Sequence, residues 1–278
     1  EYIVRDIKKQ YHSIDVFVVL TDGTAIIIED KTFTGQHGKQ IKRYADKIRN
    51  KYGTEPVCVY YKIVEQAHPE ADVVNIGRAE LLEIFRACDS QNSIFCDYRE
   101  YLEYIDSDVN AFRTDQENES WYHRYRHIYR GLFGYIVEKG IISFNYKYDW
   151  YYVNNRSGGF WTLWWYAFTS EELKASSFAN DIQDLYLQIE NHIIAVKMTA
   201  VKSDETNDHT VLDSRKKLYD FFREQVPGFA RKKWAKGKHM TVGYIGYTME
   251  NYRERIRMME QAMDKLRKEG ISSVDATI

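Results

Sequence analysis

The chain has 278 residues, enough for one large domain or two moderate ones with a complete hydrophobic core. Its 39 basic and 41 acidic residues nearly cancel, so no overall field draws it to nucleic acid, and any nucleic-acid surface must be local. The three cysteines are odd in number and lack metal-binding spacing, which suits a reducing cytoplasm. No apolar run reaches the ~18 residues of a membrane span and no signal peptide is visible, so we expect a cytoplasmic protein without membrane contact.

The first part of the chain predicts a β-meander. Tyr2–Lys8 alternates weakly between polar and apolar residues, which favours a first strand. The run Val16–Leu20 is apolar and rich in β-branched residues, which is typical of a buried strand, and Asp15 lies at its polar start. Ala25–Ile28 is a second run of the same kind. We therefore expect three strands in succession.

Three charged residues follow the second apolar run. Because side chains alternate faces along a strand, Glu29 and Lys31 should point the same way and Asp30 should point away. Carboxylates and a lysine at the edge of a hydrophobic sheet are costly unless they bind something, usually a cation. The sequence therefore predicts a cation site at this end of the second apolar run.

The turn between the two apolar runs decides which carboxylates meet. A two-residue turn at Asp22-Gly23 would place Asp15 opposite Asp30. A three-residue loop, Thr21–Gly23 with Gly23 left-handed, would place Asp15 opposite Glu29 instead. Directly opposed residues have Cβ atoms about 5 Å apart, close enough to share one divalent cation. We favour the longer loop because Glu29 then joins both Asp15 and a lysine.

A helix is expected after the turn residues Gly35–Gly38. Gln40 and Tyr44 are one helical turn apart, so both can face the carboxylates. Gly53 and Pro56 should end this helix, and Val57–Ile63 should return as a strand. An apolar stripe at helical spacing should face the core: Ile41, Tyr44, Ala45 and Ile48.

Asp15, Glu29-x-Lys31 and Gln40-x-x-x-Tyr44 lie in this order on strand, strand and helix, and the pattern resembles the PD-(D/E)xK nuclease superfamily. The added Gln-x-x-x-Tyr resembles its RecB-like and λ-exonuclease-like branch. The phrasing IDVFVVL…IIIEDK…QIKRY is also similar to a group of uncharacterised bacterial proteins of the superfamily. The resemblance covers roughly residues 1–63. Two features depart from the family pattern: Ile14 replaces a frequent proline, and the family's first helix, which often carries an acidic ligand, has no counterpart.

The resemblance implies a mixed α/β (α+β) chain with a restriction-endonuclease-like core of β-meander, helix and strand. It also implies a metal-dependent phosphodiester hydrolase. Asp15 and Glu29 would hold one or two Mg²⁺ or Mn²⁺ ions, with the backbone carbonyl of Asp30 as a further ligand. Lys31 would position the attacking water or neutralise charge that develops on the phosphate.

By resemblance, Gln40 and Tyr44 would orient the metal site or the scissile phosphate. His12 and His37 lie nearby in the sequence and are expected to be bystanders. Basic residues around the start of the helix are candidate nucleic-acid contacts: Lys39, Lys42 and Arg43.

Supporting elements are expected after this core. Val73–Ile76 predicts an edge strand, and Arg78–Ala87 and Asp97–Ile105 predict helices. The polar stretch Asp108–Ser120 is the best boundary, which gives a nuclease-like core at 1–112 and an aromatic-rich α+β unit at 113–278. The next helix has a basic face that is either solvated or in contact with substrate phosphates: Arg124, Arg126, His127 and Arg130.

The second unit predicts a mostly antiparallel sheet from about Ile141 onward. Helices are expected at Lys216–Gln225 and Glu250–Lys268, with a short strand at Thr241–Tyr247. Two features could contact nucleic acid. One is the stacking of unpaired bases on a tryptophan, although core burial is the commoner use of Trp161, Trp164 and Trp165. The other is the densest basic run, which is otherwise a solvated loop and begins at Arg231, Lys232 and Lys233.

We expect a nuclease that acts on nucleic acid, with DNA as the first candidate, in bacterial defence or DNA processing. Two alternatives stay open. The chain could be a catalytically idle nuclease fold that serves as a scaffold, or a regulatory subunit whose cleavage is gated by a partner. A homo-oligomer or a protein partner would then bind through the second unit.

Overall fold

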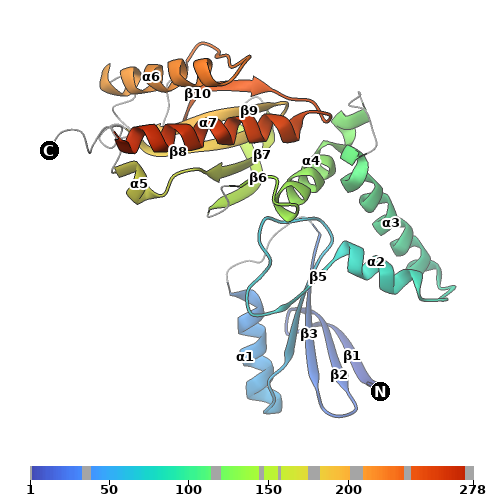
Figure 1. Ribbon diagram of the computed structural model, residues 1–278. Helices are drawn as coiled ribbons and strands as arrows, with labels where there is room; N and C mark the ends of the chain where they lie inside the picture. Colours follow the sequence, from blue (N-terminus) through green and yellow to red (C-terminus); the bar gives the residue numbers. More distant parts are fainter. Residues whose placement is uncertain are drawn as a thin grey trace. The chain divides into compact units, whose positions relative to one another are not determined.

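Ten strands form two five-stranded sheets in the computed structural model, which describes residues 2–32, 39–113, 120–143, 147–155, 158–174, 182–200, 209–234 and 239–272 (Figure 1). The predicted mixed α+β class is confirmed. The expected turn at 35–38, with His37, lies outside the described residues, as do the side chains of Arg124 and Arg126. Among the described residues, none of the helices has both the length and the apolar character that crossing a membrane requires.

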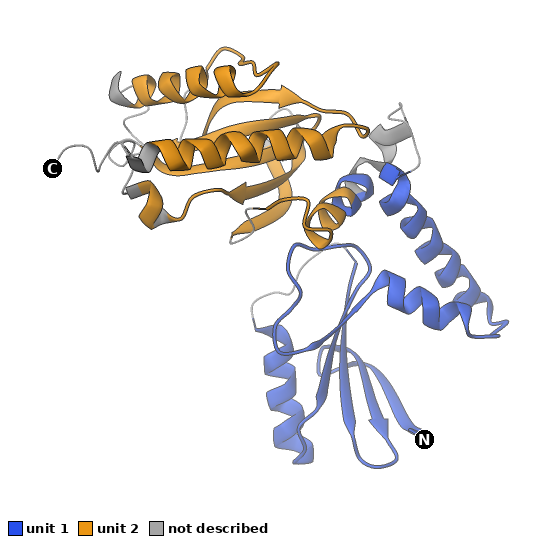
Figure 2. Cartoon of the chain, in the orientation of Figure 1, with its two compact units in different colours: residues 1–131 blue, residues 132–278 orange. Residues whose placement is uncertain are grey.

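The chain forms two compact units, residues 1–131 and 132–278 (Figure 2). The division lies later than the boundary expected at residue 112 and falls within the helix that follows the polar stretch. This helix is α4 (Ser120–Glu138). Ile128 and Tyr129 on α4 are fully buried.

Unit 1 contains the predicted order of three strands, a helix and a strand. Its sheet has the order β1-β2-β3-β4-β5. β2 is antiparallel to β1 and to β3, and β4 is parallel to β3 and to β5. The elements are β1 (Val4–Tyr11), β2 (Ile14–Leu20), β3 (Ala25–Lys31), α1 (Gln40–Tyr52), β4 (Val57–Lys62), β5 (Val74–Gly77), α2 (Arg78–Arg86), α3 (Ser93–Asn110) and a 3₁₀ turn (Ala111–Arg113).

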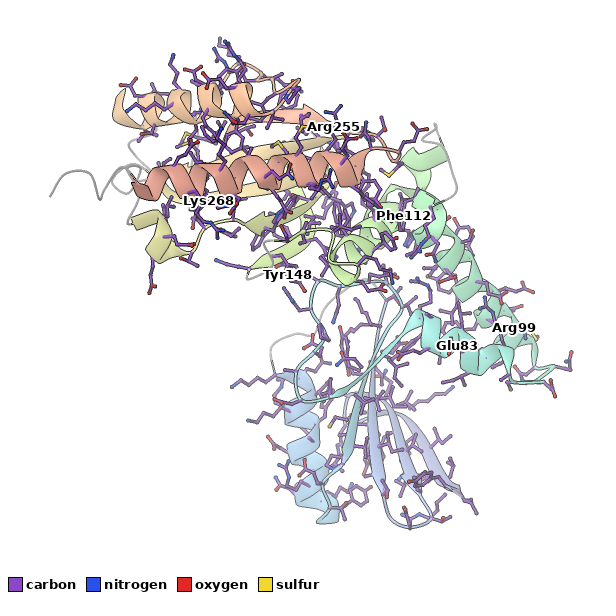
Figure 3. The ribbon with its side chains drawn as sticks, viewed as in Figure 1. Glu83, Arg99, Phe112, Tyr148, Arg255 and Lys268 are labelled. Carbon is purple, nitrogen blue, oxygen red and sulfur yellow. The ribbon has the colours of Figure 1, made fainter. Side chains whose placement is uncertain are left out.

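Helices cover both faces of this sheet. Phe17 and Ile27 pack with Tyr44 and Ile48 of α1 on one face. On the other face, a second cluster contains Tyr61, Leu82 of α2 and Leu102 of α3, with Ile28 packed against it. These two helices can be found in Figure 3 by the labelled residues Glu83 on α2 and Arg99 on α3. Because side chains alternate along β3, Glu29 and Lys31 lie on the α1 face with Ile27, and Asp30 lies on the α2–α3 face with Ile28.

The turn between β2 and β3 is the three-residue loop. Val16 pairs with Ile28 and Val19 with Ala25, and the Leu20 amide donates to the Thr24 carbonyl oxygen at 2.9 Å. Gly23 is left-handed, with φ of 89°, as this loop requires. One step beyond the Val16–Ile28 pair, Asp15 lies opposite Glu29, so the favoured register is confirmed.

The helix α3 begins earlier and ends later than predicted. Its first turn is capped by Asn92, whose side chain accepts a hydrogen bond from the Phe95 amide. The start expected at Asp97 lies one turn inside the helix, because the Asn92 cap begins an earlier first turn. Its last turn carries Val109, which is buried in a core cluster of unit 1 with Leu102 and Ile105.

Gly131 of α4 permits close packing on α3, and Gly131→Ala is expected to destabilise unit 1. A Cβ at this position would overlap the carbonyl oxygen of Val109 and come within 2.7 Å of its Cγ1. Overpacking of this kind costs about 1–3 kcal/mol, which exceeds the gain of about 1 kcal/mol from the helix propensity of alanine. Thermal unfolding followed by circular dichroism should show a lower Tm. An unchanged or higher Tm would mean that the helices are not packed this closely.

Unit 2 is an antiparallel sheet with helices on one face. The strand order is β10-β9-β8-β7-β6, and the predicted strand-rich pattern is confirmed. Trp165 Nε1 donates to Glu260 of α7 at 3.0 Å, and Lys265 of α7 donates to Gln225 of α6 at 2.8 Å. Both helices therefore lie on the Trp165 side. The elements are β6 (Tyr148–Asn155), β7 (Gly158–Tyr166), α5 (Ser170–Lys174), β8 (Ile182–Glu190), β9 (Ile193–Ala200), α6 (His209–Gln225), β10 (His239–Gly246) and α7 (Tyr252–Ser272).

Candidate active site

Asp15 is the second residue of β2, and its carboxylate accepts hydrogen bonds from two sides. Its Oδ2 accepts a hydrogen bond from the Asp30 backbone amide at 3.0 Å, and its Oδ1 accepts one from Gln10 Nε2 at 3.0 Å. Gln10 comes from β1, where its backbone is left-handed with φ of 53°. These two bonds fix the carboxylate at the edge of the sheet beside β3.

Glu29 is the centre of the cluster and is fully buried. It shares the α1 face of β3 with Ile27, as alternation along the strand requires. Lys31 Nζ donates to Glu29 Oε1 from two residues further along the strand. Gln40 Nε2 donates to the same oxygen at 2.7 Å. The predicted Glu-x-Lys pair and the first helix residue therefore meet at one atom.

The electrostatics of this cluster reflect burial and mutual charge. Burial raises the pKa of Glu29, Lys31 opposes this shift, and the nearby Asp15 carboxyl adds to it. Burial lowers the pKa of Lys31, but the hydrogen bond and charge of Glu29, with the charge of Asp15, outweigh it, so the net shift is upward. Lys31 therefore keeps its proton at neutral pH and acts as a fixed cation.

Gln40 is the first residue of α1, Tyr44 lies one turn further along, and both face the cluster. Gln40 Nε2 donates to the Tyr44 hydroxyl at 2.9 Å as well as to Glu29. The Tyr44 ring is buried, 6 % exposed, and belongs to the same core cluster as Ile48. Tyr44 therefore has two roles, because its ring packs in the core and its hydroxyl ends at the site.

Two buried oxygens of the cluster are available to a ligand. Glu29 Oε2 and Gln40 Oε1 accept no hydrogen bond from any described residue. Unsatisfied buried acceptors are costly, so such atoms often indicate an ion or water that completes the site. Among the described residues, no group of three or more His, Cys, Asp or Glu side chains is placed to hold a metal. In the described part of the chain, the carboxylates of this cluster are those of Asp15 and Glu29, and Gln40 Oε1 is a neutral oxygen in the same cluster.

Asp30 points to the opposite face of the sheet, as predicted. Burial raises the pKa of its carboxyl and Asp15 adds to the shift, while Lys31 and Lys62 oppose it. Its charge also reaches Tyr61 and Tyr98, which lie on the α2–α3 side and share a hydrogen bond at 3.0 Å. Only its backbone amide takes part in the cluster, through Asp15.

Lys62 is a buried cation that the sequence reasoning did not single out. Parallel pairing of β3 and β4 places it beside Lys31. Burial lowers its pKa to about 8, and the nearby positive charges of Arg130 and Lys31 add to the shift. The local signal in the sequence is a lysine at the end of an otherwise apolar strand. Its place beside Lys31 can be inferred only once the register of β4 with β3 is known.

The other predicted contact residues are surface cations. Lys39, Lys42 and Arg43 are exposed around the start of α1. His12 lies in the turn between β1 and β2 and is also exposed. The three remaining candidates are exposed residues of unit 2: Arg231, Lys232 and Lys233.

An Asp on one strand, Glu-x-Lys on the next and Gln-x-x-x-Tyr on the following helix thus meet at one edge of a mixed sheet. Residues 2–125 match the family model of the PD-(D/E)XK nuclease superfamily. This superfamily match spans most of unit 1 and every residue of the cluster. No curated protein and no solved structure matches the chain.

Proposed function

We propose that the chain is a metal-dependent nuclease of the PD-(D/E)xK superfamily, in its RecB-like branch, with DNA as the expected substrate. One observation carries the proposal. The buried oxygen Glu29 Oε2 has no described hydrogen-bond partner and lies in a cluster with the Asp15 carboxyl and the Lys31 cation. A fully buried carboxylate with an unused oxygen is costly in a merely structural role, and a divalent cation would offset that cost.

The donor set fits a hard cation. Asp15, Glu29 and Gln40 Oε1 offer oxygen ligands, which Mg²⁺ and Mn²⁺ prefer, and the Asp30 carbonyl is a further candidate. When bound, the metal would supply Lewis-acid stabilisation of the phosphate and lower the pKa of a water.

The chain's own residues provide the remaining parts of the site. Lys31 keeps its proton and therefore contributes a positive charge for the phosphate oxygens rather than a general base. Gln40 links Glu29 to Tyr44 and so fixes the rotamer of the carboxylate from the helix. The exposed cations Lys39, Lys42 and Arg43 would contact backbone phosphates beside the site.

Cleavage assays of the whole chain test this proposal. Single-stranded and double-stranded DNA and RNA are each incubated with the protein in Mg²⁺, in Mn²⁺ and in EDTA. We expect cleavage with a divalent metal and none in EDTA. Metal binding without cleavage of any substrate would favour a partner-gated subunit. If neither binding nor cleavage occurs, the fold is catalytically idle and the proposal fails.

The stabilisation that Mn²⁺ gives the protein should depend on pH. Metal binds the ionised carboxylate, and burial raises the pKa of Glu29, so protons compete with metal above the ordinary range of a glutamate. The Mn²⁺-induced rise in Tm should be full above this raised pKa and disappear as the pH falls through it. Without metal the sign reverses, because a raised carboxyl pKa makes the contribution of Glu29 to stability fall as the pH rises through the same window.

Thermal-shift measurements between about pH 5 and 8 check this prediction across the range in which the protein should be folded. Glu29→Gln is the matched control, because it keeps the shape of the side chain without its titration. In this variant Mn²⁺ should give no rise in Tm at any pH. A rise that is independent of pH, or that persists in Glu29→Gln, would place the metal elsewhere.

A further inference from the structure

The tryptophans of β7 divide between the two faces of the sheet in unit 2. Trp161 and Trp165 are buried, and Trp165 bonds to α7, so both belong to the core on the helix-covered face. They are therefore not available for the base stacking considered from the sequence. Trp164 alternates with them, points to the other face and is only partly buried.

On that other face, aromatic side chains from neighbouring strands surround a hollow of about 250 Å³. The rings of Trp164 and Tyr166 meet edge to face with their centres 5.4 Å apart, and the ring of Tyr166 stacks on that of Tyr186 of β8 with their centres 5.3 Å apart. Tyr151 of β6 also lines the hollow and is 48 % exposed. Thr162, Gln188 and Lys197 add polar groups to this largely aromatic wall. Aromatic walls with a few polar groups are typical of sites for planar ligands.

A basic hollow of about 180 Å³ adjoins the aromatic one, and His239 lines both. The guanidinium groups of Arg215 and Arg231 lie 4.6 and 4.4 Å from the ring centre of Trp234. Lys232 and Lys233 line the same hollow and are exposed.

The charge balance of the two hollows is strongly positive. Glu190 is the one carboxylate among the described residues that line them. It is paired with Lys197, whose Nζ lies 3.1 Å from Glu190 Oε2 and donates to Thr241 at 2.8 Å. Lys197 lines the aromatic hollow, while Glu190 and Thr241 line the basic one, so these contacts join the two.

We propose that this face of unit 2 binds single-stranded nucleic acid, with an unpaired base against Trp164 and Tyr151 and the adjoining phosphates on Lys232 and Lys233. Stacking requires a free base face, which a duplex does not offer, so the site should select single strands. The proposal rests on the nucleic-acid substrate of the proposed function, but it concerns a second site, on unit 2, that takes no part in the metal chemistry proposed for Glu29.

Fluorescence anisotropy of the full chain in EDTA tests the proposal without any cleavage. The probes are a labelled single-stranded DNA of about 16 nucleotides, the upper end of site sizes for such surfaces, its duplex, and a single strand of the same length with abasic sites. Trp164→Ala and Tyr151→Ala should each weaken single-strand binding about 5- to 140-fold, the range expected for one stacked base. The duplex and abasic probes should bind weakly and respond little.

The lysines should act through charge alone. Replacing both Lys232 and Lys233 with alanine should weaken the binding of every probe. It should also reduce the slope of log affinity against log salt concentration for the single strand by about 1.4, which is about 0.7 for each of two charges. The matched controls are Tyr104→Ala, an aromatic that is 60 % exposed on α3, and the double replacement of Lys265 and Lys268 on α7. Neither should change binding.

The results separate this inference from the proposed function. Equal affinity for the single-stranded and abasic probes, or unchanged affinity in both aromatic variants, would overturn it and leave the face to a protein partner. Tyr151 is exposed, so Tyr151→Ala is expected to fold even if Trp164→Ala does not, and Tm values of both variants show which is folded. Loss of Mn²⁺-dependent cleavage in Glu29→Gln with intact binding in EDTA would leave the inference standing.

Discussion

Glu29→Gln is expected to reduce the rate of metal-dependent cleavage by more than about 100-fold, while the protein stays folded. A loss of about 10- to 100-fold is usual for a residue that only hydrogen-bonds to a metal ligand, so a larger loss indicates a ligand itself. Glutamine keeps the shape of the buried side chain and can still accept from Gln40. It removes the negative charge that a cation would bind. The fold should persist because the variant also removes the cost of a buried carboxylate whose pKa is raised. Cleavage rates and Tm values of the two proteins check both parts.

Asp15→Asn and Asp30→Asn extend this comparison. Asp15→Asn should lose activity to a similar extent, and the double variant with Glu29→Gln should be little worse, because groups that act as a unit are not additive. Asp30→Asn is the matched control, since its side chain faces α2 and α3 and only its backbone amide contacts Asp15. An essential Asp30 side chain with a dispensable Glu29 would contradict the assignment of the site.

Tyr44→Ala should destabilise unit 1 strongly, whereas Tyr44→Phe should mainly reduce the rate of cleavage. The ring is 6 % exposed and packs with Ile48, so truncation to alanine should cost about 3–5 kcal/mol of unfolding free energy. Phenylalanine keeps the ring and loses one hydrogen bond, from Gln40, for about 0.5–1.5 kcal/mol. Urea unfolding and cleavage rates under the same conditions measure the two effects separately.

Gln40→Ala completes this test from the neighbouring position. Gln40 is at the first turn of α1, and its amide donates to Glu29 and Tyr44 rather than to the core. This variant should therefore lose activity with little loss of stability. If Tyr44→Phe and Gln40→Ala are both fully active, the two residues are structural, and the RecB-like assignment fails while the metal site can stand.

Much of unit 1 could be predicted because its signals are local. The three-residue loop follows from Gly23, and the alternation of a strand then separates Glu29 and Lys31 from Asp30. The helix stripe of Tyr44 and Ile48 likewise follows from helical periodicity. Each of these inferences needs only the spacing of nearby residues.

The features that were not predicted depend on pairing between distant segments. Lys62 comes to lie beside Lys31 through the parallel register of β3 and β4, which no local pattern encodes. Gln10 supports Asp15 only because its backbone turns to the left-handed region, which is unusual for a residue other than glycine. In unit 2, the three tryptophans of β7 are similar in sequence terms. Alternation along β7 puts Trp164 and Trp165 on opposite faces, and the docking of α7 decides which of the two faces is covered.

A crystal structure of the chain with Mn²⁺ tests the central claim most directly, because the anomalous signal of manganese locates the ion without reference to activity. We expect an anomalous peak beside Asp15 and Glu29, within coordination distance of Glu29 Oε2, the oxygen that has no hydrogen-bond partner among the described residues. Crystals of Glu29→Gln grown in the same way should lack this peak. Saturating Mn²⁺ with no ion at this cluster, or the same peak in Glu29→Gln, would contradict the assignment of a metal-dependent nuclease centre.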